Sequence, residues 1–285
     1  MLTDRDLTVL KSIAHYYTLT RAQVTQSHFP DDKDGRSTRK RLNSLLEIRF
    51  IDRTNMQVCN PAMGHPAPVF FPTRDGVAFL AEQTGEDSWR SAATQSPNWH
   101  HLYHYVTIAD QHILVDQAAG LIKGLSIPTW HSEYSVLNPF ENDPEKRFTL
   151  YSLLSIEPRL VCKPDAGFVL EKEGFRKVFY LETDRDTTKN ADRVAAQKCR
   201  GYVGMLATSR HKQHFPDANM EGFTVLIIAP SVTRRESLRR AFAEKPGAKL
   251  YKFAARTELT PESFFTEAVW RTAENEIVSL LKGAQ

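Results

Sequence analysis

The chain has 285 residues, three cysteines and a net charge of +3 at neutral pH, and its isoelectric point is near 8.7. This length allows two domains with their own cores, and the small basic excess permits nucleic-acid binding without requiring it. An odd number of cysteines without metal-ligand spacing argues against a disulfide-rich secreted protein. No apolar run is long enough to span a membrane and no signal peptide opens the chain, so we expect a cytoplasmic protein without a membrane partner.

Residues 1–84 predict a compact helical domain with a short hairpin. Thr3 with Asp6, and Thr20 with Gln23, have the spacing of capping boxes at helix starts. The expected elements are a helix after Thr3, a short helix after Thr20, a helix over 37–48, strands at 50–53 and 69–71, and a helix over about 73–83. This order is that of a winged helix-turn-helix.

The third of these helices carries a basic face. Arg36, Lys40 and Asn43 share one side of the helix by their spacing, and Arg39 lies beside them. Side chains of these types can enter the major groove while a wing contacts phosphates. We therefore expect this face to bind double-stranded DNA; the alternative is a solvated basic surface that meets a protein partner.

A polar segment without periodicity, 85–98, predicts a linker to a second domain over 99–285. The pattern there predicts a helix from about 99 to 120, a hairpin, a helix over 192–205, a strand over 224–229, a basic helix over 233–244, a strand over 249–253 and a last helix over 261–282. The arginines of the basic helix either contact phosphates or are solvated. The fold class is therefore α/β, with a mixed sheet flanked by helices.

The hairpin carries the residues that suggest chemistry. Its strands are apolar runs at 166–170 and 178–181. Glu182 and Asp184 are two apart and project from one side of the second strand, and Asp165 begins the first strand beside them. Three converging carboxylates repel one another unless a cation lies between them, and an all-oxygen cluster suits Mg²⁺ or Mn²⁺.

Pro164-Asp165 followed by Glu182-Thr183-Asp184 resembles the metal-binding motif of the PD-(D/E)xK restriction-endonuclease superfamily. The lysine of that motif is replaced here by Asp184. Because some members place the lysine on the next helix, Lys198 is the candidate for a moved lysine. Glu133, before the motif, is either a further metal-binding acid or an ordinary surface acid, and Tyr202 is either an active-site helper or a core residue.

The whole chain resembles the replication-relaxation family of plasmid and mobile-element proteins. The matching segments include Trp130-His131-Ser132-Glu133, K-P-D-A from Lys163, F-Y-L-E-T-D-R-D-T from Phe179 and K-C-R-G-Y from Lys198. The resemblance implies an N-terminal winged helix, a restriction-endonuclease-like second domain, and a role in plasmid replication or in the relaxation and mobilisation of DNA. Where the family usually has glycine, this chain has Asp186, which adds negative charge beside the site.

These observations predict a DNA-binding, metal-dependent endonuclease or nickase of a plasmid or mobile element. Asp165, Glu182 and Asp184 are the expected metal ligands, with Glu133 as a further acid, and Lys198 is expected to stabilise charge on the phosphate. The alternative is a non-catalytic DNA-binding regulator or replication accessory protein whose nuclease-like domain is degenerate. The partners compatible with either reading are double-stranded DNA, a second copy in a homodimer and other mobile-element proteins.

Overall fold

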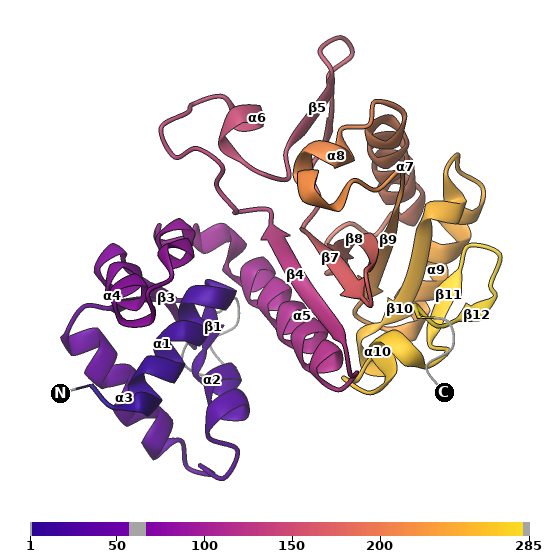
Figure 1. Cartoon of the computed structure of the whole chain (residues 1–285). Helices are drawn as coiled ribbons and strands as arrows, with labels where there is room; N and C mark the ends of the chain where they lie inside the picture. The colour runs from indigo at the N-terminus through magenta and orange to yellow at the C-terminus, as the bar shows by residue number, and fades with distance from the viewer. Residues whose placement is uncertain (1, 57–66, 282–285) are drawn as a thin grey trace. The chain divides into compact units, whose positions relative to one another are not determined.

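The computed structural model describes residues 2–56 and 67–281, which form two compact units over 1–113 and 114–285 (Figure 1). The division falls inside helix α5 (Leu102–Gly120). The segment predicted as a linker, 85–98, carries a short 3₁₀ helix at Asp87–Ser91, and Trp89 in it packs against the core of the first unit. The domain limits 1–84 and 99–285 stay predictions.

The first unit contains the helices and the two strands that its sequence pattern predicts, and in addition a short strand at Leu19–Thr20 that the pattern does not predict. They are α1 (Asp4–Tyr16), β1 (Leu19–Thr20), α2 (Arg21–His28), α3 (Arg36–Glu47), β2 (Ile51–Asn55), β3 (Pro68–Pro72) and α4 (Arg74–Thr84), followed by a 3₁₀ helix at Trp99–His101 that leads into α5. The strands form an antiparallel sheet in the order β1-β3-β2. The excursion between β2 and β3, which was expected to form the wing, lies largely outside the described residues.

Side-chain caps define the helix starts of this unit. Both predicted capping boxes form, at Thr3 with Asp6 and at Thr20 with Gln23. Asp32 accepts hydrogen bonds from the backbone N–H groups of Ser37 and Thr38, which satisfies orphan donors at the start of α3. The contacts of Asp32 fix where α3 begins.

The second unit is built on a seven-stranded mixed sheet in the order β12-β11-β10-β9-β8-β7-β4. Strands β8, β9 and β10 are parallel to one another, and the other pairings are antiparallel. This confirms the mixed α/β class. The sheet strands are β4 (Leu125–Ser132), β7 (Ala166–Lys172), β8 (Phe175–Thr183), β9 (Phe223–Ala229), β10 (Tyr251–Ala255), β11 (Trp270–Thr272) and β12 (Ile277–Val278).

Helices α7 (Ala191–Ala207) and α9 (Val232–Ala243) pack on one face of this sheet. Alternate residues of β8, Val178 and Tyr180, contribute to that core together with Tyr202 of α7 and Phe242 of α9. The next alternate residue of β8 is Glu182, so the same periodicity that builds the core directs a carboxylate into it. This placement determines the candidate site.

The predicted helix over 261–282 is wrong. That segment forms a short helix, α10 (Ser263–Thr266), and the hairpin of β11 and β12. Strand β11 pairs with β10 and extends the sheet, and Trp270 is fully buried with its Nε1 donating to the carbonyl of Phe264 at 2.8 Å. Asn275 adopts a left-handed φ of 71° at the turn. Pairing at the sheet edge therefore prevails over an amphipathic pattern that also fits a helix.

Between β4 and β7 the chain makes a small helix, α6 (Pro144–Arg147), and a hairpin of β5 (Ser152–Ser155) and β6 (Leu160–Cys162). His214, in the short helix α8 (His211–His214), ties this hairpin to the sheet. Its Nε2 lies 2.9 Å from Ser152 Oγ and its Nδ1 lies 2.8 Å from Tyr180 Oη. Burial lowers the pKa of His214 to about 3, so the folded protein keeps this ring neutral.

We expect this histidine to make the protein acid-sensitive. In the unfolded chain it takes up a proton near its ordinary pKa of 6.5, whereas in the folded chain it does so only near 3. The unfolded state then binds more protons between these values, so the free energy of unfolding decreases as the pH is lowered, by up to about 1.4 kcal/mol per pH unit. Urea unfolding of the protein and of His214→Gln between pH 6.5 and 4 measures this slope. Ser152→Ala keeps the ring and serves as the control: it should lower stability while retaining the pH slope.

Candidate functional site

The centre of the candidate site is Glu182, near the end of β8. Its side chain is buried, and both carboxylate oxygens are hydrogen-bonded from helix α7. Tyr202 Oη donates to Oε1 at 2.6 Å, and Lys198 Nζ donates to Oε2. Lys198 and Tyr202 are one helical turn apart on α7, so a single helix face supplies both donors. Tyr202 is fully buried. It is therefore a core residue that also donates a hydrogen bond to Glu182.

Burial and charge act in opposite directions on this pair. Desolvation raises the pKa of Glu182 to about 7, although the neighbouring Lys198 opposes the shift. Burial by itself lowers the pKa of Lys198, but the carboxylates of Glu182 and Asp165 outweigh that effect and hold the pKa above its usual value. The lysine therefore stays charged, and its charge opposes the protonation of Glu182 that burial favours.

Asp165 directly precedes β7 and lies beside Glu182 across the hairpin, since Ala166 pairs with Leu181. Its Oδ2 accepts a hydrogen bond from the backbone N–H of Thr183 at 2.7 Å. Glu133 follows β4, and its backbone N–H donates to the carbonyl of Asp165 at 2.8 Å. A carboxylate oxygen of Glu133 lies within 4.8 Å of one of Asp165, and Glu133 also pairs with Lys163 at 2.8 Å. Glu133, which directly follows β4, therefore lies close to Asp165 of the hairpin motif.

Asp184 faces a different partner. Arg234 of α9 binds it through two nitrogens, with Nε at 2.7 Å from Oδ2 and Nη2 at 3.2 Å from Oδ1. The same guanidinium donates to the carbonyls of Thr188 and Lys189, which precede α7. Both charged side chains are largely buried, at 13% exposed for Asp184 and 7% for Arg234. Asp184 therefore joins the strand end to α9, whereas the sequence motif had assigned it to the metal.

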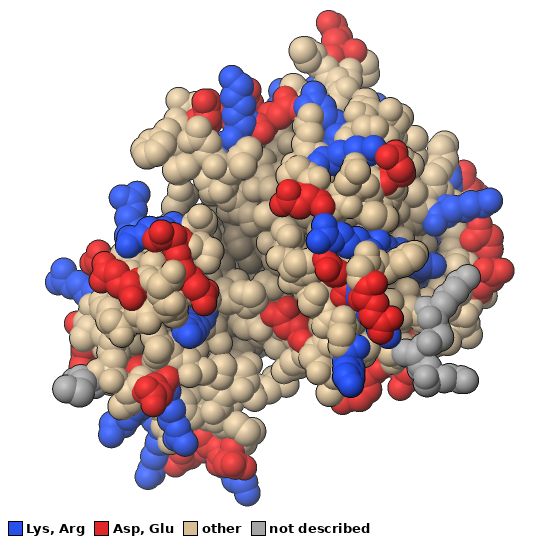
Figure 2. Space-filling model, in the orientation of Figure 1, with Lys and Arg blue, Asp and Glu red and all other residues tan. Residues whose placement is uncertain are grey.

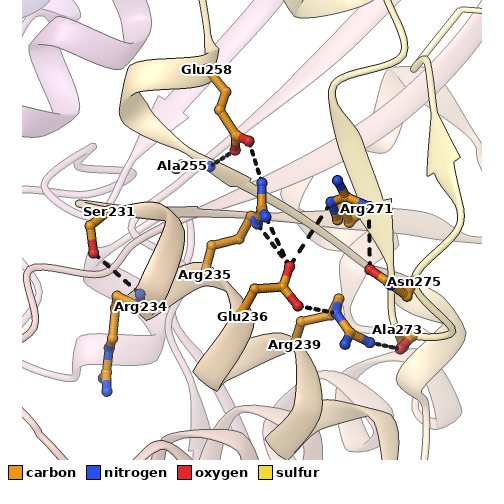
Figure 3. Close-up of polar contacts among 10 residues, drawn as sticks. All are labelled: Ser231, Arg234, Arg235, Glu236, Arg239, Ala255, Glu258, Arg271, Ala273 and Asn275. Atoms are coloured by element: carbon orange, nitrogen blue, oxygen red, sulfur yellow. Dashed lines mark hydrogen bonds and ion pairs between the residues drawn. The ribbon is translucent and has the colours of Figure 1, made fainter.

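Two of the other arginines of α9, Arg235 and Arg239, also have acidic partners (Figure 3), whereas Arg240 is exposed. Arg235 pairs with Glu258 and with Glu236, and Arg239 pairs with Glu236 at 3.0 Å and donates to the carbonyl of Ala273 at 2.8 Å. Arg234 points away from this group in Figure 3. These three arginines stabilise the fold, and neither of the roles considered from the sequence, phosphate contact or simple solvation, describes them.

In the first unit, the four residues of the predicted DNA-binding face on α3 are all exposed: Arg36, Arg39, Lys40 and Asn43. Arg36 is 84% exposed and forms a surface pair with Asp34. Arg41, on another side of the same helix, instead pairs with the buried Asp6 at 3.1 Å. On the face drawn in Figure 2, basic and acidic side chains are interspersed, so local groups such as the one on α3 matter more than the net charge of +3.

One family model matches this chain. This model, described as replication-relaxation, matches residues 10–217, which is well over half of the chain and includes both α3 and the Glu182 site. The chain belongs to the replication-relaxation family. A search of curated proteins and a search of solved structures each gave no match.

Membership in the replication-relaxation family indicates a role in the replication or relaxation of a plasmid or mobile element, and an interaction with DNA. Arg234 lies beyond the segment that the family model matches. Within the described residues, no helix has both the length and the apolar character needed to cross a membrane.

Part of the donor set at the site of this replication-relaxation protein suits a hard divalent cation. Carboxylate oxygens of Asp165 and Glu133 lie within 4.8 Å of each other, and oxygen ligands suit Mg²⁺ or Mn²⁺. Both oxygens of Glu182 accept hydrogen bonds from Lys198 and Tyr202, and burial raises its pKa, with Asp165 adding to the shift and Lys198 opposing it. Both oxygens of Asp184 face Arg234.

We expect Asp184 and Arg234 to stabilise the fold as a coupled pair. Arg234→Gln leaves the largely buried Asp184 without its partner and should lower the free energy of unfolding by about 3 kcal/mol, whereas Asp184→Asn should cost less because Arg234 keeps Asp186 at 3.3 Å. The double variant should lose clearly less than the sum, because neither charge then remains. Urea unfolding of the four proteins measures the coupling. The exposed pair Arg36 with Asp34, tested by the same cycle, should show no measurable coupling; equal coupling in the two cycles would contradict the assignment.

Proposed function

We propose that this replication-relaxation protein binds DNA through its first unit and nicks it, with Mg²⁺ or Mn²⁺, at the carboxylates of its second unit. The observation that carries the proposal is the contact of Lys198 with Glu182. The hairpin motif lacks its strand lysine, and this contact brings a lysine from the following helix to the same acid. A PD-(D/E)xK-like site with a moved lysine is the arrangement that best accounts for both residues.

The organisation of the second unit supports the same proposal. A restriction-endonuclease-like core is expected to have its acids on a hairpin within a mixed sheet flanked by helices. Here Asp165 directly precedes β7 and Glu182 lies on the adjacent strand β8 of such a sheet, with α7 and α9 on one face. The acids and the lysine come from elements that the core holds in place, which favours a preorganised site.

The roles of the side chains follow from their contacts. Asp165 and Glu182, with Glu133 beside them, are the residues that would hold the ion. Bound there, Mg²⁺ or Mn²⁺ lowers the pKa of a water molecule and offsets charge on the scissile phosphate. Lys198 carries a positive charge next to Glu182 and would stabilise the negative charge that develops on the phosphate. Tyr202 fixes the orientation of the Glu182 carboxylate by its hydrogen bond.

DNA binding is assigned to α3 of a winged helix-turn-helix. Three features support this assignment: the order of helices and strands from α1 to α4, the three-stranded sheet, and the exposure of the basic face on α3. Residues that were predicted to bind DNA stay exposed, while Arg41 of the same helix is used in the fold. A helix with this division of charge can enter the major groove.

The second candidate function is that of a non-catalytic DNA-binding accessory protein of replication. The observation that favours it is the pairing of Asp184 with Arg234, which removes one acid from the motif. In that case Lys198 and Glu182 form a structural ion pair, and the second unit serves as a scaffold. The response to divalent metal separates the two functions.

Glu182→Gln is the first test of cleavage. This change removes an oxygen ligand of the ion, so it should abolish metal-dependent nicking of supercoiled plasmid and leave DNA affinity nearly unchanged. Millimolar Mg²⁺ or Mn²⁺ should raise the Tm of the unmutated protein but not that of the variant, since binding to the folded state stabilises it. Lys198→Ala should reduce nicking and keep the rise in Tm, because its role is on the phosphate. If the unmutated protein neither nicks nor shifts its Tm with metal, the accessory function replaces the nuclease.

A second test concerns the basic face of α3. The triple change of Arg36, Arg39 and Lys40 to alanine should weaken duplex binding and reduce the slope of log affinity against log salt by about 1 per lost phosphate contact. Fluorescence anisotropy at several salt concentrations measures both quantities. The matched control removes three exposed charges of the second unit, Lys123, Arg200 and Arg240, and should leave the slope nearly intact. Equal effects of the two triple variants would mean that net charge, and not α3, determines binding.

A further inference from the structure

The connection between β4 and β7 is far longer than the sheet requires. These strands are antiparallel neighbours, paired from Ser132 with Ala166, and a tight turn can join such strands. The chain instead leaves the sheet at Glu133 and returns at Asp165, with 134–164 inserted between them. Figure 1 shows α6 and β5 of this insertion projecting beyond the end of β4. Long connections of this kind are usually functional, and this one starts and ends at candidate metal ligands.

The base of the insertion is fixed to the rest of the unit. Its first part closes on itself, because the N–H of Leu137 donates to the carbonyl of Arg147 at 2.8 Å and that of Thr149 donates to the carbonyl of Ser135 at 3.0 Å. Its second part, the β5–β6 hairpin, packs closely on α7: a Cβ added at Gly201 would lie 3.4 Å from Cys162 Sγ. These contacts hold the base of the insertion in place relative to the sheet.

The outer residue of the first part is an aromatic ring in water. Phe140 is 92% exposed and Leu137 is 69% exposed. Phe140 follows Pro139, and its N–H donates to Asn138 Oδ1 at 3.1 Å, which is an Asx turn that directs the backbone outward. A fully exposed Phe side chain gains nothing from burial, so a ring held in this way suggests a ligand with an apolar face.

The charges around the base of this loop suit a nucleic acid. Arg147 and Lys163 both lie over the ring of Phe148, at 5.6 and 5.9 Å from its centroid. Of the acids in the loop, Asp143 caps α6, Glu145 pairs with Arg210 at 3.0 Å, and Glu141 directly follows Phe140. Lys163 pairs with Glu133. Arg147, whose Nη1 donates to the carbonyl of Glu141 at 3.2 Å, is therefore the cation held next to Phe140. An aromatic ring near cations is the combination by which proteins bind unpaired bases and their phosphates.

We infer that Phe140 stacks on an unpaired base of DNA and that the insertion 134–164 is a single-strand contact beside the carboxylates. The inference rests on the proposed function, since it supplies the DNA with which that site would react. It adds a substrate class: a strand that is unpaired or melted next to the nick. The first unit then binds the duplex, and the insertion holds the separated strand.

Binding to a single-stranded oligothymidine of about 16 nucleotides, measured by fluorescence anisotropy in EDTA, tests the inference without requiring cleavage. Phe140→Ala should weaken this binding about tenfold, the effect of losing one stacked base, and Phe140→Trp should retain it. Affinity for a duplex of the same length should change by less than roughly twofold, because α3 supplies that binding. Nicking of supercoiled plasmid should fall with Phe140→Ala.

Phe175→Ala is the matched control. Phe175 is 83% exposed and begins β8, at the end of the hairpin opposite Asp165 and Glu182, so its removal should leave single-strand affinity unchanged. Equal affinity of the two alanine variants, or loss of affinity in Phe140→Trp, would overturn the inference and leave the proposed function standing. A change of oligomeric state in Phe140→Ala, measured by sedimentation velocity, would also overturn it by making the loop a self-association surface. If no protein nicks plasmid, the proposed function fails while the affinities still decide the role of Phe140.

Discussion

The buried carboxylate of Glu182 is the constraint on which the second unit depends. An ionised acid in an apolar core is costly unless hydrogen bonds and an opposite charge surround it. Lys198 and Tyr202 meet that requirement from one face of α7, so the helix that covers the sheet is also the helix that completes the site. A substitution that shifts α7 along the sheet would therefore also move the charge of Lys198 next to Glu182.

Much of the site could be predicted from the sequence because its signals are local. The apolar strands 166–170 and 178–181, the two-residue spacing of Glu182 and Asp184, and the basic face of α3 each follow from the period of one element. The choice of Lys198 rested on a resemblance, and the structure places its amine on Glu182. The metal assignments and the DNA-binding face stay predictions.

What the sequence could not reveal depends on residues that are distant in the chain. Asp184 lies 50 positions from its partner Arg234, and no spacing rule links a strand end to the third helix beyond it. The tie of Ser152 to His214 spans 62 positions and has the same character. The hairpin of β11 and β12 was mistaken for a helix because its apolar residues fit both periods, and only pairing with β10 decides between them.

The contact of Arg234 with Asp184 and with the carbonyls before α7 has a consequence for the history of the site. A lysine at position 184 would place two cations together in a largely buried position, with only Asp186 to offset them, so the strand lysine of the PD-(D/E)xK motif and an arginine at position 234 disfavour each other. Positions 184 and 234 should accordingly have changed together during divergence. Relatives with lysine on the strand should carry a neutral or acidic side chain at position 234, and their α7 should be free to lose the lysine that this chain has at position 198.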